Sequence, residues 1–244
     1  MKEQISYKRY VAYFDMLGMK TAVYRDLFKA WEALGTIDNA REQIYKYSFD
    51  LKDINKTVVL QDRLKYFIFS DTIIAFTYKD EIEDLWAILF FSIEIFCQCL
   101  HRCIPLRGGI SFGDFLFNLD KNFFLGRPLI EAHAISEPAQ WLGIILSDYV
   151  ASQCIANNIQ GGDKELVIVV DWDVEQKDSS IQKRSVINWL ATHKNNFIDK
   201  PPITAPQFYQ AFEGLFGEYA KLRDEDKRKH INTVKFINSM YKNV

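Results

Sequence analysis

Leu64-Lys-Tyr-Phe-Ile-Phe-Ser-Asp-Thr-Ile-Ile-Ala-Phe-Thr-Tyr78 is the stretch of sequence that decides the fold. Its aromatic and β-branched residues predict two short strands, over residues 64–70 and 72–78. The polar pair Ser70-Asp71 falls at their junction, although it is not the Asn-Gly or Asp-Gly pair of the commonest hairpins. We therefore expect a hairpin whose tip carries a carboxylate in otherwise apolar surroundings.

A second aspartate ends another predicted strand. Residues 7–15 finish in the apolar-aromatic run Val11-Ala-Tyr-Phe-Asp15, and Met16-Leu-Gly18 then breaks the strand. A long helix is predicted over about residues 20–52, with one apolar face formed by Leu27, Ala30, Trp31 and Leu34.

The rest of the chain alternates predicted helices and strands. Helices are expected over about residues 85–100, 129–141, 148–156, 181–195, 207–222 and 224–241, and strands over residues 106–113, 114–118, 143–147 and 165–171. The first two of these strands are expected to form a second hairpin, and the last to be buried on both faces. The order β-α-β-β-α-β, with additional strands and C-terminal helices, predicts an α+β fold with a ferredoxin-like core.

Composition limits the location and the partners of the protein. The chain has 244 residues, 30 basic and 32 acidic, and its net charge of -2 argues against a general nucleic-acid binder. The N-terminus lacks the apolar region of a secretory signal, and residues 85–100 are too short and too polar to span a membrane. The cysteines form no Cys-x-x-Cys pair, so a cytoplasmic protein with reduced thiols is expected. Aromatic residues make up 15% of the chain, which indicates a large core or a flat apolar interface.

Asp15 and Asp71 are the candidate chemical centre. In a ferredoxin-like core the first strand lies beside the hairpin strands, so the two carboxylates can converge on one point. Magnesium and manganese prefer oxygen ligands and keep positions open for substrate phosphates. The alternative is that both aspartates are ordinary turn residues, which are common at strand ends.

Five segments, in order, resemble the motifs of class III nucleotidyl cyclases. They are Phe14-Asp-Met-Leu-Gly18 for F-D-x-x-G, Phe69-Ser-Asp-Thr72 for the I-G-D-x hairpin, Arg107-Gly-Gly-Ile-Ser-Phe-Gly113 for R-x-G-I-x-x-G, Gly126-Arg-Pro-Leu-Ile-Glu-Ala-His-Ala134 for the G-x-x-V-N-x-A-x-R helix, and Gly143-Ile-Ile-Leu-Ser147 for G-x-I-x-x-S. The resemblance implies a cyclase catalytic domain over residues 1–175 and a helical C-terminal extension over residues 176–244, packed on the same domain.

The same resemblance implies a reaction and its site. A nucleoside triphosphate would be cyclised with loss of pyrophosphate, using two divalent cations, Mn²⁺ or Mg²⁺, held by Asp15, Asp71 and the carbonyl of Met16. Backbone N–H groups of Leu17 and Gly18 would cradle the triphosphate. The family's sites lie between two catalytic domains, which implies a homodimer with composite active sites. From the charge and hydropathy of the chain, neither nucleic acid nor a membrane is expected as a partner.

Two departures from the family pattern bear on the substrate. Purine cyclases of this class read the base with a Lys and an Asp, and Phe67 and Phe123 stand at those positions here. Ile130 and Ala134 stand where the family has its transition-state Asn and Arg. The chain resembles the small stand-alone uridylate and cytidylate cyclases of Pycsar anti-phage systems, which implies UTP or CTP as substrate and a separate effector that senses the diffusible cyclic nucleotide.

Further residues are candidates for substrate contact. The aromatic rings of Phe67 and Phe123 offer stacking faces for a smaller base, and Tyr66 is the alternative on the neighbouring strand position. The other candidates, taken from the matched motifs, are Phe14, Ser70, Thr72 and Arg107. Arg107 can contact the base or phosphates, or form a structural salt bridge instead. Two other functions remain open, a purine cyclase with relocated base readers and a catalytically silent domain that dimerises or binds nucleotide.

Overall fold

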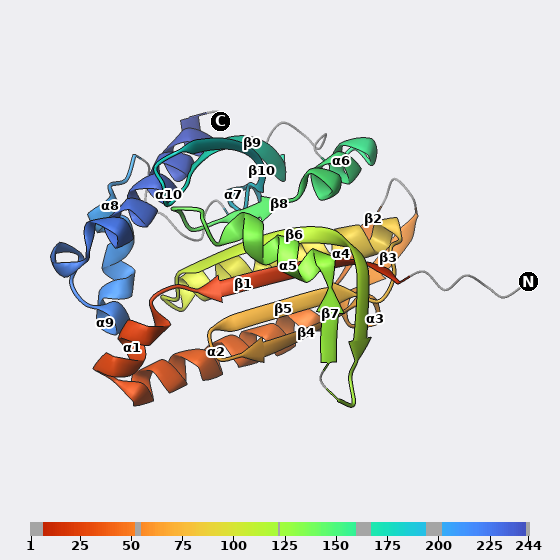
Figure 1. Ribbon diagram of the computed structural model, residues 1–244, viewed down its shortest axis with the longest axis horizontal. Helices are drawn as coiled ribbons and strands as arrows, with labels where there is room; N and C mark the ends of the chain where they lie inside the picture. The colour runs from red at the N-terminus through yellow and green to blue at the C-terminus, as the bar shows by residue number, and fades with distance from the viewer. Residues whose placement is uncertain (1–6, 52–54, 122, 160–166, 194–201, 243–244) are drawn as a thin grey trace, which may run out of the picture.

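The N-terminal half of the protein is built around an antiparallel sheet (Figure 1). A computed structural model describes residues 7–51, 55–121, 123–159, 167–193 and 202–242. Strands β4 (Leu64–Phe69), β5 (Thr72–Thr77), β1 (Lys8–Met16) and β6 (Leu106–Asn118) lie side by side in that order. With the helices between them they form β-α-β-β-α-β, so the predicted ferredoxin-like α+β core is confirmed.

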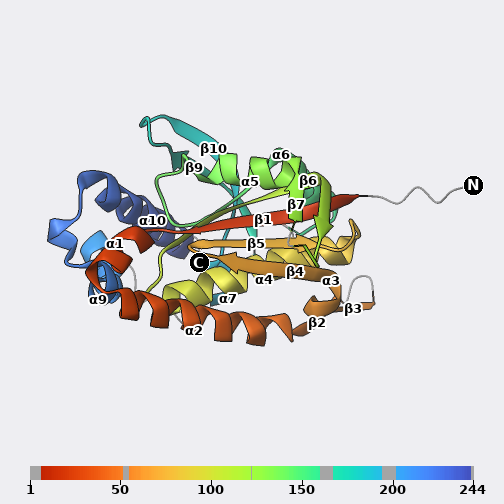
Figure 2. The same cartoon turned by 60° about the horizontal axis from the view of Figure 1, so that its bottom comes forward.

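Two helices cover one face of this sheet (Figure 2). Helix α4 (Ile82–His101) is apolar nearly all round and is buried over most of its length, between the sheet and α2 (Leu27–Tyr45). Its first turn is fixed by a capping box, in which Glu81 N–H donates to Asp84 Oδ2 at 3.0 Å. This burial explains why the most apolar stretch of the chain is a core helix.

The opposite face carries α5 (Arg127–Ser136) and α6 (Asp148–Ala156) (Figure 2). Beyond β6 the sheet continues through β8 (Ile144–Leu146), β10 (Ile181–Ile187) and β9 (Val169–Glu175). The C-terminal helix α10 (Asp224–Lys242) packs beside β9, where the Phe236 ring contacts the rings of Trp141 and Trp172. One continuous apolar core therefore joins the sheet to the C-terminal region.

The long helix predicted over residues 20–52 is wrong in its extent and in two of the four residues of its predicted apolar face. Asp26 divides it into α1 (Met19–Arg25) and α2, because the extended Asp26 backbone ends α1 and its side chain accepts from Lys29 N–H at 3.1 Å. Chain after α2 forms a small hairpin, β2 (Ser48–Leu51) with β3 (Lys56–Val59). The buried stripe of α2 is Ala30, Ile37, Ala40 and Ile44, while Leu27 and Trp31 are exposed.

The predicted second hairpin, 106–118, is a single strand. Pairing with β1 continues through Asp114, which lies opposite Lys8, so the chain does not turn at Gly113. The turn comes after Asn118, whose side chain accepts from Lys121 N–H at 3.0 Å. Strand β7 (Phe123–Gly126) then pairs back on the second half of β6.

The C-terminal region differs from the predicted helices in two places. Residues 181–187 form β10, because a turn in which Ser180 N–H donates to Asp178 Oδ1 at 2.9 Å folds them back on β9. The helix predicted over residues 207–222 is a succession of short turns: α8 (Ala205–Tyr209), η2 (Gln210–Phe212), α9 (Glu213–Phe216) and η3 (Tyr219–Lys221). Predicted residues 165–166 and 194–195 lie outside the described ones.

Two short helices, α3 (Leu60–Arg63) and α7 (Leu190–His193), complete the elements. The β9–β10 hairpin joins residues on both sides of the predicted domain boundary at 175, so the sheet itself continues into the C-terminal part. Within the described ranges, no helix combines the length and hydropathy that a membrane crossing requires. The four cysteines are free.

Candidate functional site

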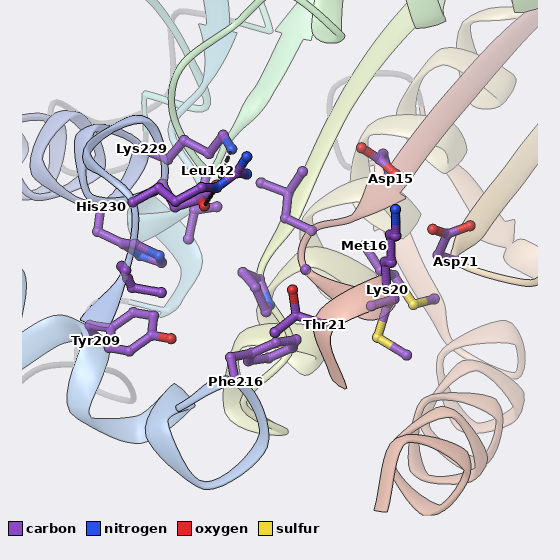
Figure 3. A pocket seen from close by; sticks show the side chains of 17 residues that line it. Asp15, Met16, Lys20, Thr21, Asp71, Leu142, Tyr209, Phe216, Lys229 and His230 are labelled. Atoms are coloured by element: carbon purple, nitrogen blue, oxygen red, sulfur yellow. Dashed lines mark hydrogen bonds and ion pairs between the residues drawn. The ribbon is translucent and has the colours of Figure 1, made fainter. Parts of the chain in front are cut away.

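Asp15 and Asp71 meet where β1 ends beside the β4–β5 hairpin. Asp15 pairs with Thr72 in the sheet register, and Met16 N–H donates to the Asp71 carbonyl oxygen at 2.8 Å. The two-residue turn between β4 and β5 requires a left-handed residue, and Ser70 supplies it with φ 56°. Backbone geometry thus places both carboxylates on one side of the sheet end (Figure 3).

Arg107 is held against Asp15 by the sheet. It lies opposite Asp15 in the β1–β6 register, and its Nη2 donates to Asp15 Oδ2 at 3.0 Å. Its Nη1 donates to the carbonyl oxygens of Glu137 and Ala139 at 2.6 and 3.2 Å. Arg107 is buried, so the sequence alternative of a structural salt bridge describes its observed contacts. This contact occupies Oδ2 of Asp15, while Oδ1 makes no hydrogen bond to the residues that the structure describes.

Gly18 forms the break between β1 and α1. Its φ of 79° lies in the left-handed region, which a residue with a side chain rarely adopts. A Cβ atom at Gly18 would lie 3.0 Å from the Phe216 ring, so the C-terminal part of the chain packs directly on this turn. Leu17 N–H donates to the Pro105 carbonyl oxygen at 2.8 Å. The Leu17 amide therefore has a partner within the fold, in contrast to its expected role as a phosphate donor.

A cavity of about 350 Å³ opens in front of these residues, with a floor that includes Pro105 and Leu142. One wall contains Asp15, Met16, Leu17, Gly18, Met19, Lys20, Thr21 and Asp71. The wall that faces it comes from the C-terminal region, with Tyr209, Phe216, Leu222, Arg223, Asp226, Lys229 and His230. Figure 3 shows the two groups of side chains on opposite sides of the cavity, and Lys20 directed toward the two carboxylates. We call these groups the strand wall and the C-terminal wall.

Sequence reasoning missed the C-terminal wall. Residues 221–229 alternate in charge, and such a run is typical of a solvated helix face. In the structure, Asp226 accepts from Arg223 Nε and from Lys229 Nζ, each at 2.9 Å. The Lys229 side chain is only 13% exposed, because it lies against the cavity instead of pointing into solvent. No motif marks these residues, since their placement depends on how α10 packs.

Two aromatic groups of the C-terminal wall lack hydrogen-bond partners. Tyr209 Oη and His230 Nδ1 are buried and unpaired, and their rings are in edge contact with centroids 4.7 Å apart. Burial raises the pKa of Tyr209 to about 12, so the phenol stays protonated at neutral pH. Burial also lowers the pKa of His230 to about 4, helped by the charge of Lys229, so its imidazole is neutral. Both groups present neutral polar atoms to the cavity.

Several predicted substrate residues do not line this cavity. Phe14 belongs to the core, and its ring fills the space beside Gly108, where a Cβ atom would lie 2.3 Å from Phe14 Cδ1. Tyr66 points toward the α2 and α4 face, where its ring stacks on Phe91 and lies under the guanidinium group of Arg41. Ser70 and Thr72 flank Asp71 in the turn and do not reach the cavity lining.

The two phenylalanines at the purine-reader positions lie elsewhere. Phe67 is half-buried in a second apolar cluster, with ring centroids 6.2 Å from Phe76 and 4.6 Å from Phe124. Phe123 begins β7 and is exposed. Strand β7 pairs with the half of β6 that lies near Lys8, at the opposite end of β1 from Asp15. A single chain therefore does not bring these rings to the strand wall.

The donor set of the strand wall fits magnesium or manganese. Two carboxylates face one cavity, and the Asp71 carboxylate has no hydrogen-bond or ion-pair partner among the described residues. Within the same residues, no group of three His, Cys, Asp or Glu side chains could enclose a metal ion. Magnesium commonly binds through one or two carboxylates, with water and substrate phosphates completing its shell. This arrangement suits an ion that arrives with a phosphate substrate, and does not suit a closed structural site.

Comparison with known proteins bears on the fold. No family model and no curated protein sequence matches the chain. The catalytic core of a rhodopsin-guanylyl cyclase with converted specificity, in complex with ATPalphaS, is similar in structure, with a TM-score of 0.52, 13% identity, and coverage of 74% of this chain and 94% of that one. A bacterial light-regulated adenylyl cyclase gives a TM-score of 0.50 at 11% identity and covers 87% of this chain, which spans 59% of its length. The chain thus has the fold of a nucleotidyl cyclase catalytic core.

Proposed function

We propose that this protein is a metal-dependent nucleotidyl cyclase. The observation that carries the proposal is the meeting of Asp15 and Asp71 at one cavity, at the end of β1 in a cyclase-type sheet. The reaction would be attack of the ribose 3′-hydroxyl of a nucleoside triphosphate on its own α-phosphorus, with pyrophosphate leaving. The Mn²⁺ or Mg²⁺ ions of this site would supply charge neutralisation and a lowered pKa of the attacking hydroxyl.

The residues of the chain supply position and charge. Asp15 and Asp71 would hold the two cations, together with the carbonyl of Met16. Arg107 would keep Asp15 in one orientation through the 3.0 Å contact to Oδ2, leaving Oδ1 to bind a cation. Gly18 supplies the left-handed turn that ends β1 beside the two carboxylates, and the Phe216 ring packs on it. The contribution of these groups is pre-organisation, because none of them is displaced during the reaction.

We infer a pyrimidine triphosphate, UTP or CTP, as the substrate. Phe67 and Phe123 replace the Lys and Asp that read a purine in the cyclases this sequence resembles. Neither ring can make those polar contacts, and each leaves surface on which a base can stack. A purine cyclase with base readers elsewhere is the alternative within the same activity.

The proposed active form is a homodimer with composite sites. Phe69, beside Asp71, is 82% exposed, and Tyr24, Phe28 and Trp31 form a further exposed aromatic surface on α1 and α2. Exposed aromatic side chains on this scale are typical of interfaces. Delivery of Phe67 and Phe123 from the second subunit would also explain why they lie far from the strand wall of their own chain.

The proposed role is synthesis of a second messenger in the cytoplasm. By its resemblance to Pycsar cyclases, the chain would release a cyclic nucleotide that a separate effector protein senses during anti-phage defence. Residues 1–175 would form the catalytic domain and residues 176–244 an extension packed on it. The cavity adds a reason to treat the two as one functional unit, because both contribute walls.

The test is product formation from each of the four nucleoside triphosphates with Mn²⁺, resolved by mass spectrometry. Cyclic UMP or cyclic CMP as the main product supports the proposal, and a cyclic purine nucleotide supports the alternative substrate. Ile130 and Ala134, which cannot donate hydrogen bonds from their side chains, favour a second candidate, a silent nucleotide-binding domain. Absence of any cyclic product, with nucleotide binding retained, would establish that second function.

A further inference from the structure

The cavity has opposite charge on its two walls. The strand wall carries the carboxylates Asp15 and Asp71 beside Lys20, and its net charge is negative. The C-terminal wall carries Arg223 and Lys229 beside Asp226, and its net charge is positive. Figure 3 shows Asp15 and Asp71 on one side of the cavity and Lys229 on the other. A ligand that complements both walls needs a cationic part and an anionic part. A complex of divalent cations with a polyphosphate has this character, since its cations seek carboxylates and its phosphates seek Arg and Lys.

Asp226 arranges the two cations for such a ligand. One carboxylate oxygen accepts from Arg223 Nε and the other from Lys229 Nζ, both at 2.9 Å. The pairing occupies one N–H of each group, and the Arg223 side chain, 76% exposed, keeps both terminal nitrogens without a hydrogen bond to the described residues. The terminal nitrogens of an Arg guanidinium group are strong donors to phosphate oxygens, because two of them can bind one phosphate together.

The unpaired polar atoms of the same wall are independent support for a ligand. Tyr209 is 2% exposed and His230 is 6% exposed, yet Tyr209 Oη and His230 Nδ1 have no hydrogen-bond partner in the described part of the chain. Leaving buried polar atoms unpaired is costly, so these two atoms need a partner, which at a cavity wall is a water molecule or a ligand. Both residues line the cavity, and Figure 3 shows the Tyr209 hydroxyl directed into it.

We propose that the C-terminal wall, through Arg223 and Lys229, binds the terminal phosphates of the substrate in the same chain that holds the metal ions at Asp15 and Asp71. The inference rests on the proposed function for the identity of the substrate. The extension is then a part of the active site supplied in cis, while the base is read elsewhere. Phe216, which packs on Gly18, ties the two walls together.

The experiment is calorimetric titration of the full chain with inorganic tripolyphosphate in the presence of Mn²⁺. We expect saturable binding by the wild type. The dissociation constant of the double variant Arg223→Gln/Lys229→Gln should be larger by a factor of about ten, because each lost contact is a charge-assisted hydrogen bond. Lys221→Gln is the matched control, since Lys221 belongs to the same segment, pairs with Glu218 and lies outside the cavity. It should bind like the wild type. The single variant Arg223→Gln changes an exposed side chain and should fold normally. Weaker binding by this variant therefore reflects the lost guanidinium group and not misfolding.

Three outcomes would overturn the inference. The first is equal affinity of the double variant and the wild type for tripolyphosphate, and the second is absence of saturable binding by the wild type. The third is a higher turnover of the double variant, which would mean that Arg223 and Lys229 obstruct the cavity. Cyclisation by the wild type with an unchanged KM in the double variant would reject the inference and leave the proposed function standing. If tripolyphosphate binding depends on Arg223 and Lys229 but no nucleoside triphosphate gives a cyclic product, the phosphate site is supported and the proposed cyclase activity is rejected.

Discussion

The two walls of the cavity are built in different ways. The strand wall is fixed by backbone: a sheet register, the Met16 N–H to Asp71 oxygen bond and the Arg107 contact to Asp15. The C-terminal wall is fixed by side chains on short helices and on α10, with Asp226 joining two cations and an aromatic cluster around His230. The carboxylates proposed to bind metal ions are thus positioned by the backbone. The cations proposed to bind phosphates are positioned by contacts between side chains.

Removal of one carboxylate from the strand wall should have the largest effect. Asp71→Asn keeps the shape of the turn and removes the charge that a cation requires, so cyclic nucleotide formation should fall roughly a hundredfold or more. Asp120→Asn is the control, because Asp120 is exposed in the turn after β6 and lies outside the cavity. Initial rates at several Mn²⁺ concentrations measure the effect. Full activity of Asp71→Asn would show that the strand wall does not hold the metal.

Acid should weaken the C-terminal wall through His230. Its pKa is about 4 in the folded protein against 6.5 for the free side chain, so the unfolded chain binds the extra proton first. The contribution of neutral His230 to the free energy of unfolding is fully present above pH 6.5 and is lost as the pH falls toward 4. The total loss is about 3 kcal/mol. Lys229 and Asp226 face the imidazole and act in opposite directions on its pKa.

The measurement compares urea unfolding of the wild type and His230→Gln from pH 7 to pH 4. The gap between their free energies of unfolding should shrink by about 3 kcal/mol over this range. Asp84, whose pKa burial raises to about 6, gives a slope of opposite sign, and the comparison cancels it because both proteins contain it. A constant gap would mean that the imidazole is not buried in solution.

Loss of Arg107 should show that the strand wall is part of the fold. Arg107→Gln leaves the carbonyl oxygens of Glu137 and Ala139 short of a donor and removes the partner of Asp15. Asp15 keeps partial contact with water, so we expect a loss of about 2–3 kcal/mol, at or below the low end for broken buried pairs. Arg127→Gln, exposed at the start of α5, should change the free energy by less than about 0.5 kcal/mol. Equal effects of the two substitutions would contradict the structural role.

The strand wall could be predicted from sequence, and the C-terminal wall could not. The apolar-aromatic and β-branched runs around Asp15 and Asp71 are a local signal, and a ferredoxin-like order of elements places the two strands side by side. Helix α10 was also predicted nearly to its ends, yet the pattern of residues 221–229 gave no sign that Lys229 faces a cavity. Its position depends on distant contacts, such as those of Phe236 with Trp141 and Trp172.

Another sequence error concerns the buried face of α2. The buried face of α2 relies on Ala30 and Ala40, which carry little hydrophobic signal, while the more apolar Leu27 and Trp31 point outward. Phe67 and Phe123 are assigned to the substrate by resemblance alone, and the assignment stays a prediction because neither ring lines the cavity of this chain.

The smallest expected effect concerns Ser70, which precedes Asp71 in the β4–β5 turn and stands where the resembling motif has glycine. Ser70 has φ 56°, and a left-handed conformation costs a residue with a Cβ atom about 1 kcal/mol or more. Ser70→Gly removes that cost but gains backbone freedom in the unfolded chain, so a net stabilisation of about 0.5 kcal/mol is expected. Ser70→Val, with a branched Cβ, should destabilise by about 1–2 kcal/mol. Urea unfolding measures both, and destabilisation by glycine would mean that the Ser70 side chain contributes more to the turn than its backbone strain costs.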